Sequence, residues 1–387
     1  MTMLVYFFFQ DEEPSERFAR FVTAPDVSES EWLDFKVHAS FSYYSKVDVE
    51  KYSTLVDSVA VSSNYIVDMK KSCFYDFDYS FEEAYASYIS KSQAVVETID
   101  RCEQELKNYL KIKLTNPSPK ISPSIYIEEG GDVFIPRGFE LVRYNEFSIG
   151  YAMWSVHQLQ TGEISDSEYI DRIRLGMSLA SKTNSLRLSV QNLVEVRYLL
   201  KGLESNLNIF RSESVSKLTN SLLITFTPDT AFDFHRWAQL YTLEQSLTEA
   251  LNTRIKSSES KMPFRLQKTL NQAAEQWPEN LGDSVNDEVS LLRNWNNWAG
   301  YVLLKVASPK FIALEVDFLE TATRTFLIKA KLNFNNCSNK VDTCLSKITA
   351  MKSPLSNDYI YYKNGKISLS NPHSRELITV DLVEESN

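Results

Sequence analysis

The sequence predicts an α+β protein with a β-rich N-terminal region, a helical middle that forms an antiparallel helical bundle, and a C-terminal β-hairpin. Three observations support this fold class. Aromatic and β-branched residues are dense in residues 1–79. Apolar residues recur at three- and four-residue steps through the middle of the chain. An Asn-Gly pair stands between alternating apolar runs near the C-terminus.

The first part of the chain is expected to form strands and then a long helix. LVYFFF, FKVHASFSYY and STLVDSVAVSSNYIVDM have strand-like composition. The helix is expected to begin at Ser80, because SFEE has the composition of a capping box. Its apolar stripe includes Ile99, Cys102, Leu106 and Tyr109. LTNPSPKISPS contains three prolines and ends this helix.

The middle of the chain is expected to contain a hairpin and then helices. Gly130 and Gly131 lie between two apolar runs, a pattern typical of a hairpin. Ser165 and Glu168 form a second capping-box sequence that opens a helix. Asp229 is placed to cap a long helix.

The C-terminal region is expected to return to strands. YIYYKNGKISLS places Asn364 and Gly365 between two apolar runs, which is the strongest short hairpin signal. RELITVDLV is a candidate third strand.

These elements suggest five divisions of the chain. They are 1–113, a β-rich region plus the long helix; 114–124, a Pro-rich connector; 125–228, a hairpin and helices; 229–335, the helical bundle; and 336–387, a C-terminal region with the β-hairpin.

The composition is that of a folded globular protein and disfavours some chemistries. The chain has 387 residues, 43% hydrophobic and 24% charged. It has only 10 glycines and neither a GxGxxG nor a P-loop sequence, so no nucleotide cofactor is expected. Its net charge of −10 is uneven: residues 1–60 hold 11 acidic and 5 basic residues, and residues 251–352 hold 14 basic and 10 acidic residues. Two interpretations remain: solvated faces, or oppositely charged segments that dock on each other or on a sister subunit.

The cysteines and the apolar N-terminus bear on location. Cys73, Cys102, Cys337 and Cys344 lack the CxxC spacing of zinc sites, so reduced, buried thiols and no metal are expected. MTMLVYFFFQ is short and DEEPSER follows directly, which indicates a buried strand and no membrane span. We therefore predict a cytoplasmic protein.

No catalytic residue is predicted. The four histidines show no HxH or HExxH spacing, and no GxSxG elbow is present. IALEVDFLETATRTFLIKAKL has apolar residues where a magnesium-dependent nuclease would place its second acidic ligand.

LLRNWNNWAGYVLL contains an Arg-Asn pair of the kind that opens the RN-x3-H sequence of helical-bundle ribonucleases of the HEPN type. The histidine that would transfer the proton is missing. The preferred interpretation is a helix packed into the core, with Asn296 and Asn297 facing outward. The alternative is a partner-binding surface of Arg293, Trp295 and Trp298.

Basic residues of the second half are candidates for nucleic-acid contact, because lysine and arginine neutralise phosphates. The candidate nucleic-acid-binding residues are Arg254, Lys256, Lys261, Arg265, Lys268, Lys329 and Lys331.

The sequence thus favours a non-enzymatic subunit or adaptor of a larger cytoplasmic assembly, acting through protein–protein interfaces with a protein partner or by self-association. The alternatives are a nucleic-acid-associated component that uses the basic region 254–352, and a divergent nuclease.

Overall fold

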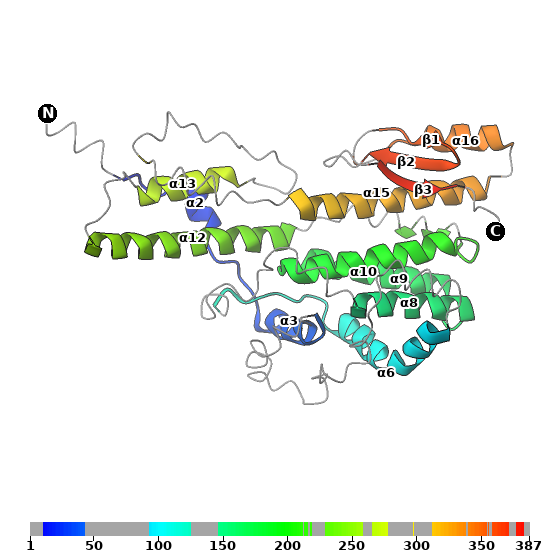
Figure 1. The fold of residues 1–387 in the computed structure, drawn as a ribbon, viewed down its shortest axis with the longest axis horizontal. Coiled ribbons are helices and arrows are strands. Elements are labelled where there is room, and N and C mark those ends of the chain that lie inside the picture. The colour runs from blue at the N-terminus through cyan, green and yellow to red at the C-terminus, as the bar shows by residue number, and fades with distance from the viewer. Residues whose placement is uncertain are drawn as a thin grey trace. The chain divides into compact units, whose positions relative to one another are not determined.

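The computed structural model is mostly helical, with one small C-terminal sheet (Figure 1). The described residues are 11–42, 93–124, 146–211, 213–215, 217–218, 229–257, 265–277, 297, 312–337, 340–353, 355, 358–370 and 377–382. The chain divides into two compact units, each built from segments far apart in the sequence. Unit 1 comprises residues 1–28, 121–135 and 229–311, and unit 2 comprises residues 29–120, 136–228 and 312–387.

Unit 1 is a small helical assembly of α2 (Glu16–Phe21), α12 (Asp229–Ser257) and α13 (Leu266–Gln276), which contact one another. A helix of six residues is not stable alone, so α2 depends on burial of its two phenylalanines. Their shared core contains Phe18, Phe21, Phe232, Leu240, Leu247, Leu270, Ala273, Ala274 and Trp277. The long helix that was predicted from Asp229 is confirmed.

Unit 2 is built around one central helix. Its helices are α3 (Glu29–Ser42), α6 (Gln93–Thr115), α8 (Glu146–Thr161), α9 (Asp166–Lys182), α10 (Leu186–Ser205), α15 (Ile312–Asn335) and α16 (Val341–Thr349). The central helix is α10, which contacts α8, α9 and α15 (Figure 1).

Two glycines allow these helices to approach closely. A Cβ atom at Gly202 of α10 would collide with Tyr169 Oη and Val156 Cγ2. A Cβ atom at Gly176 of α9 would lie 2.7 Å from Val196 Cγ2. Small residues are therefore required where α8, α9 and α10 meet.

The sheet of unit 2 has the strands β1 (Tyr361–Lys363), β2 (Lys366–Ser370) and β3 (Leu377–Asp381), antiparallel in the order β1-β2-β3. Asn364 and Gly365 have φ values of 52° and 76°, as the tight turn between β1 and β2 requires. The sheet lies against α15 (Figure 1). The predicted hairpin and third strand are both confirmed.

Two further predictions in unit 2 are confirmed. Ser165 and Glu168 form a capping box, with Ser165 N donating to Glu168 Oε2 at 2.8 Å and Glu168 N donating to Ser165 Oγ at 3.2 Å. The apolar stripe of α6 is buried at Ile99, Cys102 and Leu106.

The predicted strand FKVHASFSYY is wrong where the structure describes it, because its first eight residues belong to the helix α3. Trp32, Phe35 and His38 are buried at three-residue steps, which is helical spacing. The aromatic content of this segment suggested a strand, but the spacing of its buried residues is that of a helix. The other predicted N-terminal strands, the Ser80 capping box and the Gly130-Gly131 hairpin lie outside the described residues.

Residues 229–335, which the sequence predicted as one helical bundle, contribute α12 and α13 to unit 1 and α15 to unit 2. Within unit 2, α15 packs against both α10 and the sheet.

The prediction of reduced thiols is wrong for every described cysteine. Cys337 and Cys344 form a disulfide with an S–S distance of 2.01 Å, and Cys102 is also disulfide-bonded. A spacing of seven residues does not suit a metal knuckle, but here a helix end and a following helix bring the two sulfurs together.

Across the part of the chain that the structure describes, no helix is long and apolar enough to cross a membrane.

Candidate functional site

The strands β2 and β3 of the C-terminal sheet bury one face, whereas all three residues of β1 are exposed. Because side chains alternate along a strand, Ile367, Leu369, Ile378 and Val380 point inward and are buried. On the opposite side, Tyr361 pairs with Ser368 of β2, which pairs with Thr379 of β3. Ser368 in the central strand is buried, whereas Tyr361 and Leu377 on the two outer strands are exposed on this second side.

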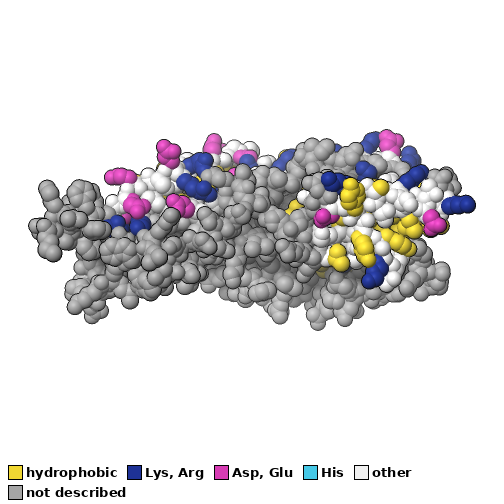
Figure 2. Space-filling model, turned by 90° about the horizontal axis from the view of Figure 1, so that it is seen from above, with side chains coloured by type: hydrophobic (Ala, Val, Ile, Leu, Met, Phe, Trp, Pro, Cys, Tyr) yellow, Lys and Arg dark blue, Asp and Glu magenta, His cyan; other side chains and the backbone are white. Residues whose placement is uncertain are grey.

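Large apolar side chains gather on this second side. Tyr359, Tyr361 and Leu377 are 63%, 57% and 65% exposed. Figure 2 shows hydrophobic side chains clustered over this part of unit 2, with lysine and arginine side chains around them. Single exposed apolar residues are ordinary, but a cluster of them on a sheet marks an interaction surface.

Lysines border this cluster. Lys352 pairs with Tyr359 in an isolated bridge, and Lys363 pairs with Lys366 across the hairpin. Asp381 forms an ion pair with Lys366 at 3.0 Å, and both partners are exposed. We call the three apolar residues and the three lysines the outer sheet face.

The predicted nucleic-acid-binding residues that the structure describes belong to both units. Arg265 and Lys268 lie at the start of α13 in unit 1, whereas Lys329 and Lys331 lie on α15 in unit 2. Lys268 Nζ lies 3.9 Å from Glu12 Oε1, and Lys331 is only 4% exposed.

The remaining candidates lie wholly or partly outside the described residues. The side chains of Arg254 and Lys256, which belong to α12, are outside the described residues, as are the whole of Lys261, Arg293, Trp295 and Trp298.

Asn297 corrects the interpretation of LLRNWNNWAGYVLL. It was expected to face outward, but it is completely buried. Its Oδ1 accepts from Arg265 N at 2.8 Å, and its Nδ2 donates to Thr269 Oγ1 at 2.9 Å. Asn297 is buried because its side chain hydrogen-bonds with polar groups at the start of α13. Helical periodicity in the sequence does not reveal such a requirement for a hydrogen-bond partner.

A second polar constellation is buried inside unit 2. The ammonium of Lys113 on α6 donates to the carboxylate of Glu195 on α10, and both residues are at most 1% exposed. Tyr109 Oη donates to the other carboxylate oxygen at 2.9 Å. Burial, followed by the charge of Glu195, raises the pKa of Tyr109 well above its ordinary value. Burial lowers the pKa of Lys113, and Glu195 opposes that change.

This constellation is satisfied by protein groups. The charges of Lys113 and Glu195 neutralise each other, so neither is presented as a nucleophile or base. Nearby, Arg172 donates to Ser155 Oγ and Gln158 Oε1, both at 2.8 Å. We therefore assign the constellation to stability. No sequence pattern predicted this constellation, although a glutamate on the apolar stripe of α10 was a signal.

The two buried histidines that the structure describes, His38 and His235, are also packed inside the protein and are not part of a catalytic group among the described residues. His38 Nε2 donates to the Asn116 carbonyl oxygen at 2.7 Å, and burial lowers the pKa of His38 to about 4. Burial likewise lowers the pKa of His235 to about 4. Asp233 pairs with Arg236 at 2.7 Å.

No group of three or more histidine, cysteine, aspartate or glutamate side chains that could hold a metal occurs among the described residues. Comparison of the chain with protein-family models, with curated proteins and with solved structures finds no match.

Proposed function

We propose that this chain is a non-enzymatic subunit or adaptor that acts through protein–protein contacts made by its outer sheet face. The observation that carries the proposal is the exposure of Tyr359, Tyr361 and Leu377 on the side of the sheet opposite to its buried residues, which are Ile367, Leu369, Ile378 and Val380. Tyrosine offers a large contact area at low cost in conformational entropy and is enriched in interfaces.

The side chains of this face indicate what kind of surface the partner has. The three apolar side chains favour an apolar surface on the partner, and the lysines at positions 352, 363 and 366 favour carboxylates around it. A three-stranded face is small, so we expect an interface at the low end of the size range and a reversible complex.

A nucleic-acid partner is the second candidate. Tyrosine rings on an antiparallel sheet can stack on unpaired bases, and the adjoining lysines can contact phosphates. The protein partner is preferred because, among the predicted nucleic-acid-binding residues whose side chains are described, Lys331 is buried and Lys268 lies beside Glu12.

The cytoplasmic location was predicted from the short apolar N-terminal segment, the lack of a membrane-length apolar run and the expectation of reduced thiols. The disulfide bonds of the described cysteines argue against it.

The test compares the full chain with the triple variant Tyr359→Ser, Tyr361→Ser, Leu377→Ser. The matched control is Leu114→Ser with Ile209→Ser, which removes two other exposed apolar side chains of unit 2. A photo-crosslinking amino acid at position 361 identifies the contacting protein in the native host. Binding of that purified protein should weaken at least tenfold in the triple variant and remain unchanged in the control.

Two results would overturn the proposal. One is equal binding of the partner to the wild type and the triple variant. The other is crosslinking to nucleic acid alone, accompanied by an affinity for single-stranded RNA or DNA that falls steeply with salt and disappears in the triple variant. That second result would establish the nucleic-acid alternative.

A further inference from the structure

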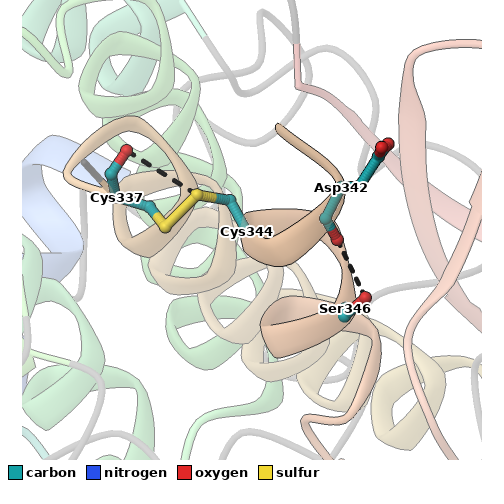
Figure 3. The surroundings of a disulfide bond; sticks show 4 residues. All are labelled: Cys337, Asp342, Cys344 and Ser346. Carbon is teal, nitrogen blue, oxygen red and sulfur yellow. Dashed lines mark hydrogen bonds between the residues drawn. A yellow bond between two sulfur atoms is a disulfide. The ribbon is translucent and has the colours of Figure 1, made fainter. Parts of the chain in front are cut away.

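The Cys337–Cys344 disulfide joins the end of one helix to the start of the next. Cys337 follows the C-terminus of α15, and Cys344 lies in the first turns of α16, with a Cα–Cα distance of 5.9 Å (Figure 3). Cys344 Sγ also lies 3.6 Å from the carbonyl oxygen of Cys337. The bond therefore fixes the direction in which the chain leaves α15.

The helix α16 has few other means of holding its position. It has nine residues, and its N-cap residue Lys340 makes no side-chain capping bond. A helix this short is marginal alone. It is held against unit 2 by Cys344 and Ile348, which are buried, and by Leu345, which packs partly buried against the core.

The disulfide also supports the path into the sheet. After α16, Met351 accepts a hydrogen bond from Ile360 N at 3.3 Å, and Lys352 pairs with Tyr359 immediately before β1. The bond thus fixes a segment that leads directly to the outer sheet face.

The described cysteines are all oxidised. Cys102, in the buried stripe of α6, is disulfide-bonded like Cys337 and Cys344, and no free cysteine occurs among the described residues. Structural disulfides form and persist in oxidising compartments and are rare in the cytosol.

We propose that Cys337 and Cys344 are an oxidation site at which a disulfide-bearing oxidant protein introduces a structural disulfide, and that the chain folds in an oxidising compartment. This inference does not rest on the proposed partner binding. It replaces the sequence-based expectation of a cytoplasmic location.

The exposure of the two cysteine residues sets the order of the exchange. Cys337 is partly exposed and Cys344 is buried, so the oxidant reaches Cys337 first. The Cys337 thiolate attacks the disulfide of the oxidant, forms a mixed disulfide and releases one thiolate. The Cys344 thiolate then attacks Cys337 Sγ and releases the second. Two protein thiols become a disulfide, and the oxidant takes up two electrons and two protons.

The first experiment measures the thiol state of the full chain in its native host. Cells are quenched in acid and alkylated, and Cys102, Cys337 and Cys344 are examined by mass spectrometry before and after reduction. We expect alkylation only after reduction, together with a crosslinked peptide pair joining residues 337 and 344. Alkylated Cys337 and Cys344 in the freshly quenched, unreduced sample would overturn the proposal.

The second experiment tests the order of attack with oxidised glutathione as the disulfide. In the folded full chain, Cys344→Ser should accumulate a glutathione adduct on Cys337 at least tenfold faster than Cys337→Ser accumulates one on Cys344. Circular dichroism confirms that both variants are folded. If a variant does not fold, the wild type reduced under native conditions is pulsed with oxidised glutathione and the first adduct is mapped by mass spectrometry. Equal rates, or first modification at Cys344, would contradict the assignment of Cys337 as the entry cysteine.

Discussion

The carboxylate of Asp11 accepts the backbone N–H of Lys268 at 3.0 Å and that of Gln267 at 2.9 Å, so the N-terminal segment caps a helix 256 residues further along the chain. The helix α13 needs this cap because its own N-cap residue makes no side-chain capping bond. At its other end, Arg17 Nε donates to the Ala274 carbonyl oxygen at 3.0 Å. An acid at the N-terminus and a base at the C-terminus both complement the helix dipole.

Replacing Asp11 by alanine should destabilise α13 by about 1 kcal/mol, because two backbone amides of its first turn lose their acceptor. Hydrogen exchange of the α13 amides measures this effect within unit 1. Glu13→Ala is the control, since it removes the same charge from the same exposed segment but keeps the backbone carbonyl of Glu13, which accepts from Asn271 Nδ2 at 2.9 Å. Equal protection of α13 in both variants would refute the capping role.

The Lys113–Glu195 pair should behave as a unit. Lys113→Met and Glu195→Leu should each destabilise the protein by about 3–5 kcal/mol, because each leaves one buried charge without its partner. The double variant should cost much less than the sum of the two, since no buried charge remains. Urea unfolding measures the coupling. The exposed pair Glu103 and Lys107 provides the control cycle, for which we expect less than about 0.5 kcal/mol. Additive costs at the buried pair would contradict this prediction.

Acidification should destabilise both units through their buried histidines. The pKa values of His38 and His235 are about 4 in the folded chain, against an ordinary value of 6.5. The unfolded state therefore binds more protons as the pH falls below 6.5. Each neutral histidine makes its full contribution to the free energy of unfolding above pH 6.5. This contribution is lost progressively as the pH falls towards 4, by up to about 3 kcal/mol for each histidine.

The pH dependence can be assigned with His38→Gln, whose amide can still donate to the Asn116 carbonyl. The melting temperature of this variant should fall less between pH 7 and pH 5 than that of the wild type. His157 is partly exposed, so the melting temperature of His157→Gln should decrease between pH 7 and pH 5 by as much as that of the wild type. A parallel decrease in His38→Gln as well would exclude His38 as a source of the pH dependence.

Gly202→Ala should destabilise unit 2 by about 1–3 kcal/mol, because the added methyl group has no space beside Tyr169 and Val156. Thermal unfolding monitored by circular dichroism tests this. Gly202→Ala combined with Val156→Ala should recover part of the loss, since one of the colliding groups is removed. A Gly202→Ala protein as stable as the wild type would show that α8, α9 and α10 separate easily.

The sequence by itself determined the elements whose signals are local. The turn at Asn364 and Gly365 follows from the left-handed backbone that both residues tolerate. The Ser165–Glu168 capping box and the apolar stripe of α6 follow from contacts between residues three or four positions apart. Each of these features was predicted because the interacting groups are close in the sequence.

Only the tertiary structure decided which distant groups meet. Asp11 reaches α13, Asn297 turns inward to the start of the same helix, and Lys113 meets Glu195 across two helices. The same holds for the outer sheet face, since alternation allows either side of a strand to be buried until α15 covers one of them. A buried polar group is stable only with a partner, and its sequence neighbours do not reveal which distant residue provides that partner.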